Sequence, residues 1–117
     1  MELVDTSIWI EHFRRGMRDL ADRLSEGLVL THPWVCGELA CGYLKNRAAI
    51  LSDLAALPLV QVATDAEVLH LIEERGFWGR GLGWVDCHLI TSALLSHCRL
   101  WTLDKKLAQA VDELHLY

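Results

Sequence analysis

Four carboxylates stand in apolar or small-residue surroundings, where acidic side chains are rare. They are Asp5, Glu38, Asp86 and Asp104. A buried carboxylate is costly unless it is paired, protonated or bound to a metal. The four are spread along the whole chain, so only a folded core could bring them together. Because they would then repel one another, a divalent cation is the simplest neutraliser, and the residue types predict a metal site.

The local sequence around these acids indicates how they would meet. Asp5 closes the short segment 2–4 and Asp104 closes the apolar segment 100–103, so each stands where a strand ends and a helix begins. In parallel α/β sheets, ligands bind beyond the carboxyl ends of the strands. Glu38 and Asp86 need only project from helices near that edge to join the other two.

Each acid also has an ordinary explanation. Asp is a common N-cap at a strand-to-helix junction, which would account for Asp5 and Asp104. Asp86 would suit the positive end of its helix. Glu38 could face solvent, but its neighbours one turn away are apolar or small, which makes that explanation weak. All four explanations must hold at once to remove the site, so we favour the site.

The hydrophobic pattern predicts strands that alternate with helices. The expected strands are 2–5, 28–30, 59–62, 100–103 and a last one around His115. The expected helices cover residues 17–25, 47–57, 65–75 and 85–97, and three more begin at residues 6, 33 and 104. Thr6 or Ser7 is expected to cap the first helix, and Asp65 the helix 65–75. Four glycines between 76 and 83 predict a mobile loop. This alternation implies an α/β fold, a three-layer α/β/α sandwich with a central parallel sheet.

Composition limits the class of protein. With 117 residues, 52% of them hydrophobic, the chain is expected to form one domain over 1–117 with an ordinary core. No apolar run approaches the ~20 residues of a membrane helix, and acids interrupt the N-terminal segment, so we expect neither membrane insertion nor a signal peptide. A cytoplasmic location and four free cysteines follow. The cysteines lack the close spacing of a structural zinc site.

The four acids, with their neighbours, resemble the motifs of PIN-domain ribonucleases, especially the VapC-type toxins of prokaryotic toxin–antitoxin pairs. The matching pieces are Val4-Asp5-Thr6-Ser7-Ile8-Trp9, Glu38-Leu39-x-x-Gly42, Asp86 followed by Leu89 and Ala93, and Thr102-Leu103-Asp104. No single piece is specific, whereas the ordered set in a chain of this size is. Two departures are Ile90-Thr91, where many relatives carry small alanines, and Lys105-Lys106, where some place a further acid. The second departure removes a possible extra metal ligand.

The resemblance implies a PIN-like nuclease domain with metal-dependent endoribonuclease activity, using Mg²⁺ or Mn²⁺ and leaving a 5′-phosphate and a 3′-hydroxyl. It further implies a homodimer and a cognate antitoxin that wraps the N-terminal helices and inserts a segment toward the acids. The expected catalytic acids are Asp5, Glu38, Asp86 and Asp104. The expected metal ligands among them are Asp5, Asp86 and Asp104, with Glu38 completing the cage or orienting the attacking water. Supporting hydroxyls are expected from Thr6, Ser7 and Thr102, although a capping or turn role is the commoner one for such residues.

A net charge of −5 is unusual for a protein that binds RNA, because phosphate contacts draw on Lys and Arg. Arg75 and Arg80 flank or lie in the glycine-rich loop that leads to Asp86, and we predict that they contact RNA. Exposed aromatic residues mark interfaces, and we predict Trp78 and Trp9 as contacts for a partner.

Three other classes of protein compete with this interpretation. A dehalogenase-like phosphatase requires a second Asp two residues after the first, where this chain has Ser7. A phosphorelay receiver requires an Asp at the end of the 59–62 segment, and this chain has none there. A non-catalytic PIN scaffold that acts through protein binding stays as the alternative function. The intact acids argue against a scaffold, which has no use for their repulsion.

Overall fold

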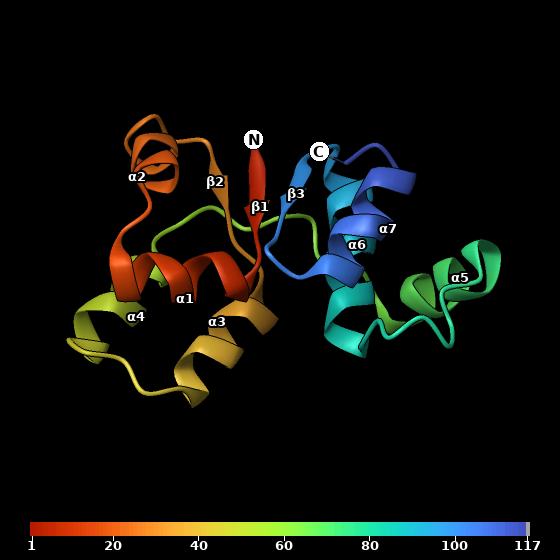
Figure 1. Ribbon diagram of the computed structural model, residues 1–117, viewed down its shortest axis with the longest axis horizontal. Coiled ribbons are helices and arrows are strands. Elements are labelled where there is room, and N and C mark those ends of the chain that lie inside the picture. Colours follow the sequence, from red (N-terminus) through yellow and green to blue (C-terminus); the bar gives the residue numbers. More distant parts are fainter. Residues whose placement is uncertain (117) are drawn as a thin grey trace.

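The computed structural model describes residues 1–116, which form a parallel sheet between two groups of helices (Figure 1). The strands are β1 (Glu2–Val4), β2 (Val29–Leu30) and β3 (Arg99–Trp101), in the order β2-β1-β3. The central strand places Leu3 opposite Leu30 on one side and Leu100 on the other. The strands run parallel, so their carboxyl ends meet at one edge.

Seven helices surround this sheet in the described part of the chain. They are α1 (Thr6–Arg15), α2 (Arg18–Ser25), α3 (Pro33–Cys41), α4 (Arg47–Ala55), α5 (Asp65–Arg75), α6 (Trp84–Ser96) and α7 (Lys105–Glu113). Figure 1 shows α1 to α4 beside β2 and α5 to α7 beside β3, with the strands between the two groups. The predicted α/β architecture with a central parallel sheet is confirmed.

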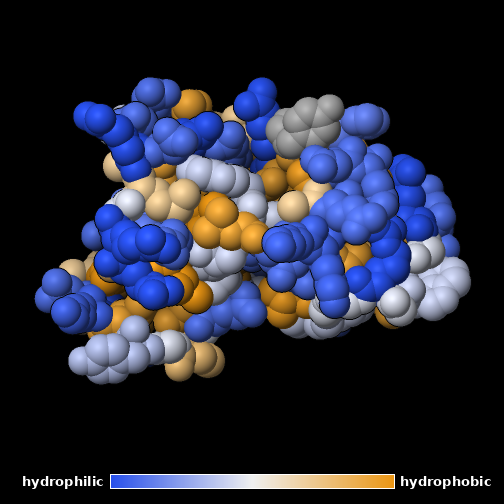
Figure 2. Space-filling model, in the orientation of Figure 1, coloured by the Kyte–Doolittle hydropathy of each residue, from blue (hydrophilic) through white to orange (hydrophobic). Residues whose placement is uncertain are grey.

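The core explains why the strands and α6 read as nearly continuous apolar sequence. Leu3 and Val4 are fully buried, as expected for strands covered on both faces. Residues 87 to 93 of α6 are all buried, so this helix lacks a polar side. Ile90 and Thr91, which depart from the small residues of the third motif, fit here, because the Thr91 hydroxyl donates to the Cys87 carbonyl at 2.7 Å. On the face drawn in Figure 2, hydrophobic colour gathers mainly near the sheet and between α1 and α4.

Two predicted strands are wrong. The segment 59–62 contributes only one bridge, between Thr31 and Leu59. The Val60 amide still donates to the Thr31 carbonyl at 3.0 Å. The amides of Gln61 and Ala63 donate instead to serine hydroxyls of α6 at 2.8 and 3.0 Å, so the chain leaves the sheet there. Around His115 the backbone enters the left-handed region with φ 56°, which interrupts any extended segment.

Two predicted helix caps are also wrong, because the residue at the N-cap position lies one or two positions earlier in the sequence than predicted. Asp5, rather than Thr6 or Ser7, precedes the first turn of α1. Thr64, rather than Asp65, caps α5, and it forms a reciprocal capping box with Glu67. The predicted free state of the four cysteines is confirmed. Within residues 1–116, no helix has the length and apolar character needed to cross a bilayer.

The glycine-rich loop offers a test of the fold. Gly81 has φ +77°, and an added Cβ would lie 2.5 Å from the Lys106 side chain. We expect Gly81→Ala to lower the free energy of unfolding by about 1 kcal/mol, mainly through backbone strain, since the lysine can move. Gly37→Ala is the matched control: it lies inside α3 with open space around it and should raise stability by about 0.5–1 kcal/mol. Urea unfolding of both variants measures the difference, and equal effects would contradict the strain.

Candidate active site

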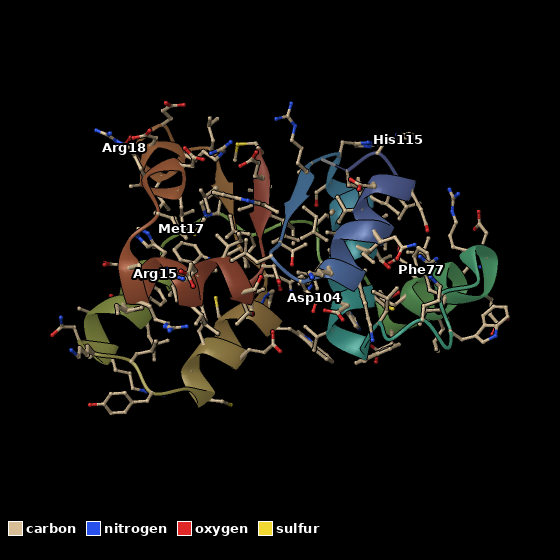
Figure 3. All side chains as sticks on the ribbon, in the orientation of Figure 1. Arg15, Met17, Arg18, Phe77, Asp104 and His115 are labelled. Atoms are coloured by element: carbon tan, nitrogen blue, oxygen red, sulfur yellow. The ribbon has the colours of Figure 1, made fainter. Side chains whose placement is uncertain are left out.

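The carboxyl ends of β1 and β3 bring Asp5 and Asp104 to the same edge of the sheet. Asp5 directly follows β1, is 7% exposed, and its amide donates to the Trp101 carbonyl at 2.9 Å. Asp104 follows β3 by three residues and begins α7, where Figure 3 labels it below the sheet. The sequence prediction that strand ends position these two acids is therefore confirmed.

A network of hydroxyl groups connects the two acids. Oδ2 of Asp5 accepts hydrogen bonds from Ser7 Oγ and Thr102 Oγ1, both at 2.7 Å. Each hydroxyl oxygen also accepts a backbone N–H at 3.0 Å, Ser7 from Leu103 and Thr102 from Asp104. The network fixes the Asp5 carboxylate and the turn that carries Asp104 as one unit.

Glu38 joins from α3 through the first turn of α1. Its Oε1 accepts a hydrogen bond from Thr6 Oγ1 at 2.8 Å. Glu38 is exposed, so the solvated position considered from the sequence is correct for the side chain as a whole. The Thr6 contact nevertheless places the carboxylate next to the residue that follows Asp5.

Asp86 lies in the first turn of α6, where its Oδ2 accepts the Gly83 amide at 2.9 Å. Burial raises the pKa of Asp86, although the hydrogen bond from Gly83 opposes that shift. The charges of Asp5, Asp104 and Glu38 raise the pKa further. Four acids from four separate segments therefore share one electrostatic site, as an ionised Asp86 experiences all three of the others.

The capping explanation holds for one of the two strand-end acids. Asp104 Oδ1 accepts the Leu107 amide at 2.9 Å and so caps α7. Asp5 occupies the equivalent position before α1, yet its side chain makes no cap hydrogen bond and turns to the two hydroxyls instead. Capping alone does not account for a buried Asp at position 5.

The donor set fits a hard divalent cation. In each of the four carboxylates, hydrogen bonds from the described residues reach one oxygen only, and the donors are neutral hydroxyl or amide groups. None of the ion pairs between residues 1 and 116 includes any of these acids. Carboxylate oxygens suit Mg²⁺ or Mn²⁺. Among the described residues, no group of three Asp, Glu, His or Cys side chains is arranged closely enough to hold a metal ion. Metal binding therefore requires the free carboxylate oxygens to rotate toward one another.

Thr102 gives a test of the hydroxyl network. Thr102→Val keeps the side-chain shape but removes the donor to Asp5 and the acceptor for the Asp104 amide. We expect the free energy of unfolding to fall by about 1–3 kcal/mol, and the cleavage activity expected from the sequence to fall by about 10-fold or more, because two acids lose their fixed orientation. Thr91→Val is the control, since among the described residues that hydroxyl is hydrogen-bonded only to a carbonyl within α6. Similar losses of cleavage in the two variants would contradict the positioning role.

Comparison with known proteins agrees with this geometry. The model of the PIN domain matches residues 3–113, which is nearly the whole chain. The chain belongs to the PIN domain family. It is also 47% identical over 114 residues to Ribonuclease VapC32 of Mycobacterium tuberculosis, in strains CDC 1551 / Oshkosh and ATCC 25618 / H37Rv. That match covers 97% of this chain and 92% of each relative.

The residues predicted to contact RNA or a partner of this PIN domain lie in different settings. Arg80 donates to both carboxylate oxygens of Glu113, at 3.0 and 2.7 Å, and its guanidinium lies 5.2 Å from the Phe77 ring centroid. RNA contact by Arg80 stays a prediction, and it requires this pair to open. Arg75 is exposed at the end of α5, and Trp78 is 64% exposed.

Trp9 is only 3% exposed and packs against Phe13, with ring centroids 5.8 Å apart. Its burial means that a partner at this place on the PIN domain would contact the residues around the indole more than the indole itself. Ile10, the next residue, is 45% exposed and offers such a surface.

Sequence reasoning missed a buried histidine pair beside the acids. His32 is fully buried and precedes α3, where its Nδ1 accepts the Trp34 amide at 3.0 Å. His88 is 2% exposed in α6, and its Nε2 lies 2.9 Å from Asp65 Oδ1. The other ring nitrogen of each histidine is buried without a partner among the described residues. His88 stands in the apolar stripe of α6, which is the one sequence signal that could have indicated its burial.

Proposed function

We propose that this PIN-domain chain is a metal-dependent endoribonuclease, the toxin of a type II toxin–antitoxin system, that acts on RNA in the cytoplasm. The observation that carries the proposal is the convergence of four acids whose partners are all neutral. A protein that held these acids only for structure would gain from a Lys or Arg among them. The name of its 47% identical relatives, Ribonuclease VapC32, supports the same activity.

Within the described chain, each of the four acids keeps one carboxylate oxygen free for a role in the reaction. Asp5, Asp86 and Asp104 would hold the cation, Mg²⁺ or Mn²⁺. When bound, such a cation supplies positive charge that polarises the scissile phosphate, acidifies a nearby water and offsets charge on the leaving oxygen. Thr6 occupies Oε1 of Glu38, which leaves Oε2 to orient the attacking water and accept its proton. Attack on phosphorus breaks the bond to the 3′-oxygen, which takes up a proton from solvent, so the products carry a 5′-phosphate and a 3′-hydroxyl.

An apolar groove on the N-terminal helices supports an antitoxin partner. A hollow of about 720 Å³ lies between α1, α3 and the start of α4, and it is lined by Ile10, Phe13, Leu39, Leu44 and Ile50 among others. Glu38 lies in the same lining. A bound segment could therefore cover apolar surface and reach a catalytic acid, which would block cleavage. We also propose that the protein forms a homodimer of two such chains.

The proposal is tested by cleavage of structured and single-stranded RNAs with Mg²⁺, Mn²⁺ or EDTA. Wild-type protein should cut only with metal, and Asp5→Asn, which keeps an oxygen for the two hydroxyls, should fail to cut while remaining folded. Cutting that persists in Asp5→Asn would mean a contaminant or a misplaced site. A folded wild-type protein that neither cuts RNA nor binds metal by calorimetry would favour the non-catalytic scaffold.

A further inference from the structure

The indole of Trp34 is an exposed ring with a prepared support. Trp34 lies in the first turn of α3 and is 37% exposed. It stacks on the His88 ring, with centroids 4.6 Å apart and planes 20° from parallel. His88 in turn meets the edge of Trp84, at 4.8 Å and 82°. One face of Trp34 is therefore fixed by neighbouring rings while part of its surface stays open to solvent.

The polar groups under Trp34 fix its orientation at some cost in stability. Asp65 holds the His88 ring through Nε2, and His32 holds the Trp34 backbone amide. Both histidines keep one buried nitrogen without a partner in the described chain. Aliphatic side chains would fill this space without unpaired polar atoms. A histidine adds a flat ring whose plane a hydrogen bond can set, which is what a supported stacking surface requires.

The position of Trp34 connects it to the catalytic acids. Trp34 and Glu38 are four residues apart in α3, so they lie on the same face one turn apart, about 6 Å along the axis. His88, the support, is two residues beyond Asp86 in α6. α3 follows the carboxyl end of β2 after two residues, and Asp86 in the first turn of α6 lies near enough to feel the charges of the other three acids. A base next to a phosphate held by the acids would lie within reach of the indole.

Charge makes such a contact useful to this chain. The net charge is −5, and four arginines are already paired with glutamates, namely Arg15, Arg23, Arg80 and Arg99. The net negative charge weakens the attraction that the remaining Lys and Arg side chains offer to RNA phosphates. Stacking of a base on an aromatic ring needs no positive charge and tolerates every base.

We propose that Trp34, supported by His88, is a stacking platform for the nucleobase adjacent to the scissile phosphate. The inference rests on the proposed ribonuclease function and names a binding subsite of that same site. Trp34 would set the position of single-stranded RNA across the acids, so that the contact contributes to binding more than to the chemical step.

The experiment pairs protein variants with RNA that lacks one base. A single-stranded RNA cut by the wild-type protein is remade with one abasic nucleotide, placed in turn at each position around the cut. We expect one abasic position to raise KM about 10-fold for wild-type protein, and Trp34→Leu to raise KM equally on intact RNA with little change in kcat. Abasic RNA and Trp34→Leu together should cost no more than either change alone. Trp34→Phe should restore most of the KM.

The controls separate stacking from a merely structural role. Trp78→Leu removes the other strongly exposed indole, and its effect should be independent of the abasic position. Additive effects of Trp34→Leu and every abasic position would overturn the platform, even if the protein cleaves RNA as proposed. A Trp34→Leu variant that loses binding of the antitoxin alone would reassign Trp34 to a protein interface and also overturn it. A wild-type protein that neither cuts nor binds RNA would remove the proposed function and this subsite together.

Discussion

Asp86→Asn should abolish metal-dependent RNA cleavage, by about 10³-fold or more, and leave the folded protein as stable as the wild type or more stable. Activity is lost because removal of one carboxylate weakens the cation site, and the cation supplies several kcal/mol of transition-state stabilisation. Each loss of roughly 1.4 kcal/mol slows the reaction tenfold. The asparagine oxygen can still accept the Gly83 amide, so the start of α6 is kept.

Electrostatic repulsion explains why Asp86→Asn should not destabilise the protein when no metal is bound. Burial and three neighbouring acids all disfavour the ionised form of Asp86 and raise its pKa. A neutral amide of the same shape removes that repulsion when no metal is present. Addition of Mg²⁺ at about 100 times its Kd should stabilise the wild type by about 2.7 kcal/mol and the variant much less. The order of stability should therefore reverse between EDTA and Mg²⁺.

Thermal unfolding and single-turnover cleavage, each with EDTA and with Mg²⁺, measure the two effects on the same preparations. Asp112→Asn is the matched control, because it removes an exposed aspartate of α7 away from the four acids. It should cleave as the wild type does and show no reversal of stability. An Asp86→Asn variant that is inactive but clearly destabilised in EDTA would show that the carboxylate has a structural role instead.

The folded state should lose about 3 kcal/mol through His32 alone as the pH falls from about 7 to about 4. Burial, and to a smaller extent the charge of the neighbouring His88, lower the pKa of His32 from 6.5 to about 4. Unfolding exposes the ring, which then takes up a proton at any pH below 6.5. Because the unfolded state binds more protons than the native state in this window, stability falls as the pH falls from about 6.5 toward about 4. Each pKa unit of difference corresponds to about 1.4 kcal/mol.

Urea unfolding at pH 7 and pH 5 tests this value against His32→Asn. Asparagine is a good N-cap and can still accept the Trp34 amide, but it does not titrate. The free energy of unfolding of the wild type should drop by about 2 kcal/mol more than that of His32→Asn between the two pH values. His70→Asn, which changes an exposed histidine on α5, should keep the pH dependence of the wild type. Identical pH dependence of the wild type and His32→Asn would show that His32 titrates normally.

The parts of the site that were predictable from sequence are those set by local chain geometry. Asp5 and Asp104 each follow a short apolar segment, and parallel strands must present such positions at a common edge. The identity of their partners was not local. Ser7 was visible as a neighbour of Asp5, but its bond to the Leu103 amide depends on a residue 96 positions away.

The errors have the same origin. The segment 59–62 has the composition of a strand, yet the hydroxyls of Ser96 and Ser92 on α6 accept the amides of Gln61 and of Ala63 just after it. Nothing near position 60 in the sequence indicates this. Arg80 looked available for RNA, whereas α7 supplies Glu113 as its partner from 33 positions away. His32 precedes a proline, and nothing in the local sequence indicates that its ring centroid will lie 6.1 Å from that of His88.

The order of strands in the sheet has a consequence for how the protein is made. β1 is synthesised first but lies in the centre, and it gains its second neighbour only when β3, about 97 residues later, has been synthesised. Contacts so distant in sequence form slowly and late. Since the Asp5 carboxylate depends on Thr102, a nascent chain cannot complete the proposed catalytic centre before Thr102 has been synthesised. A fragment that ends before β3 would therefore lack the proposed nuclease activity.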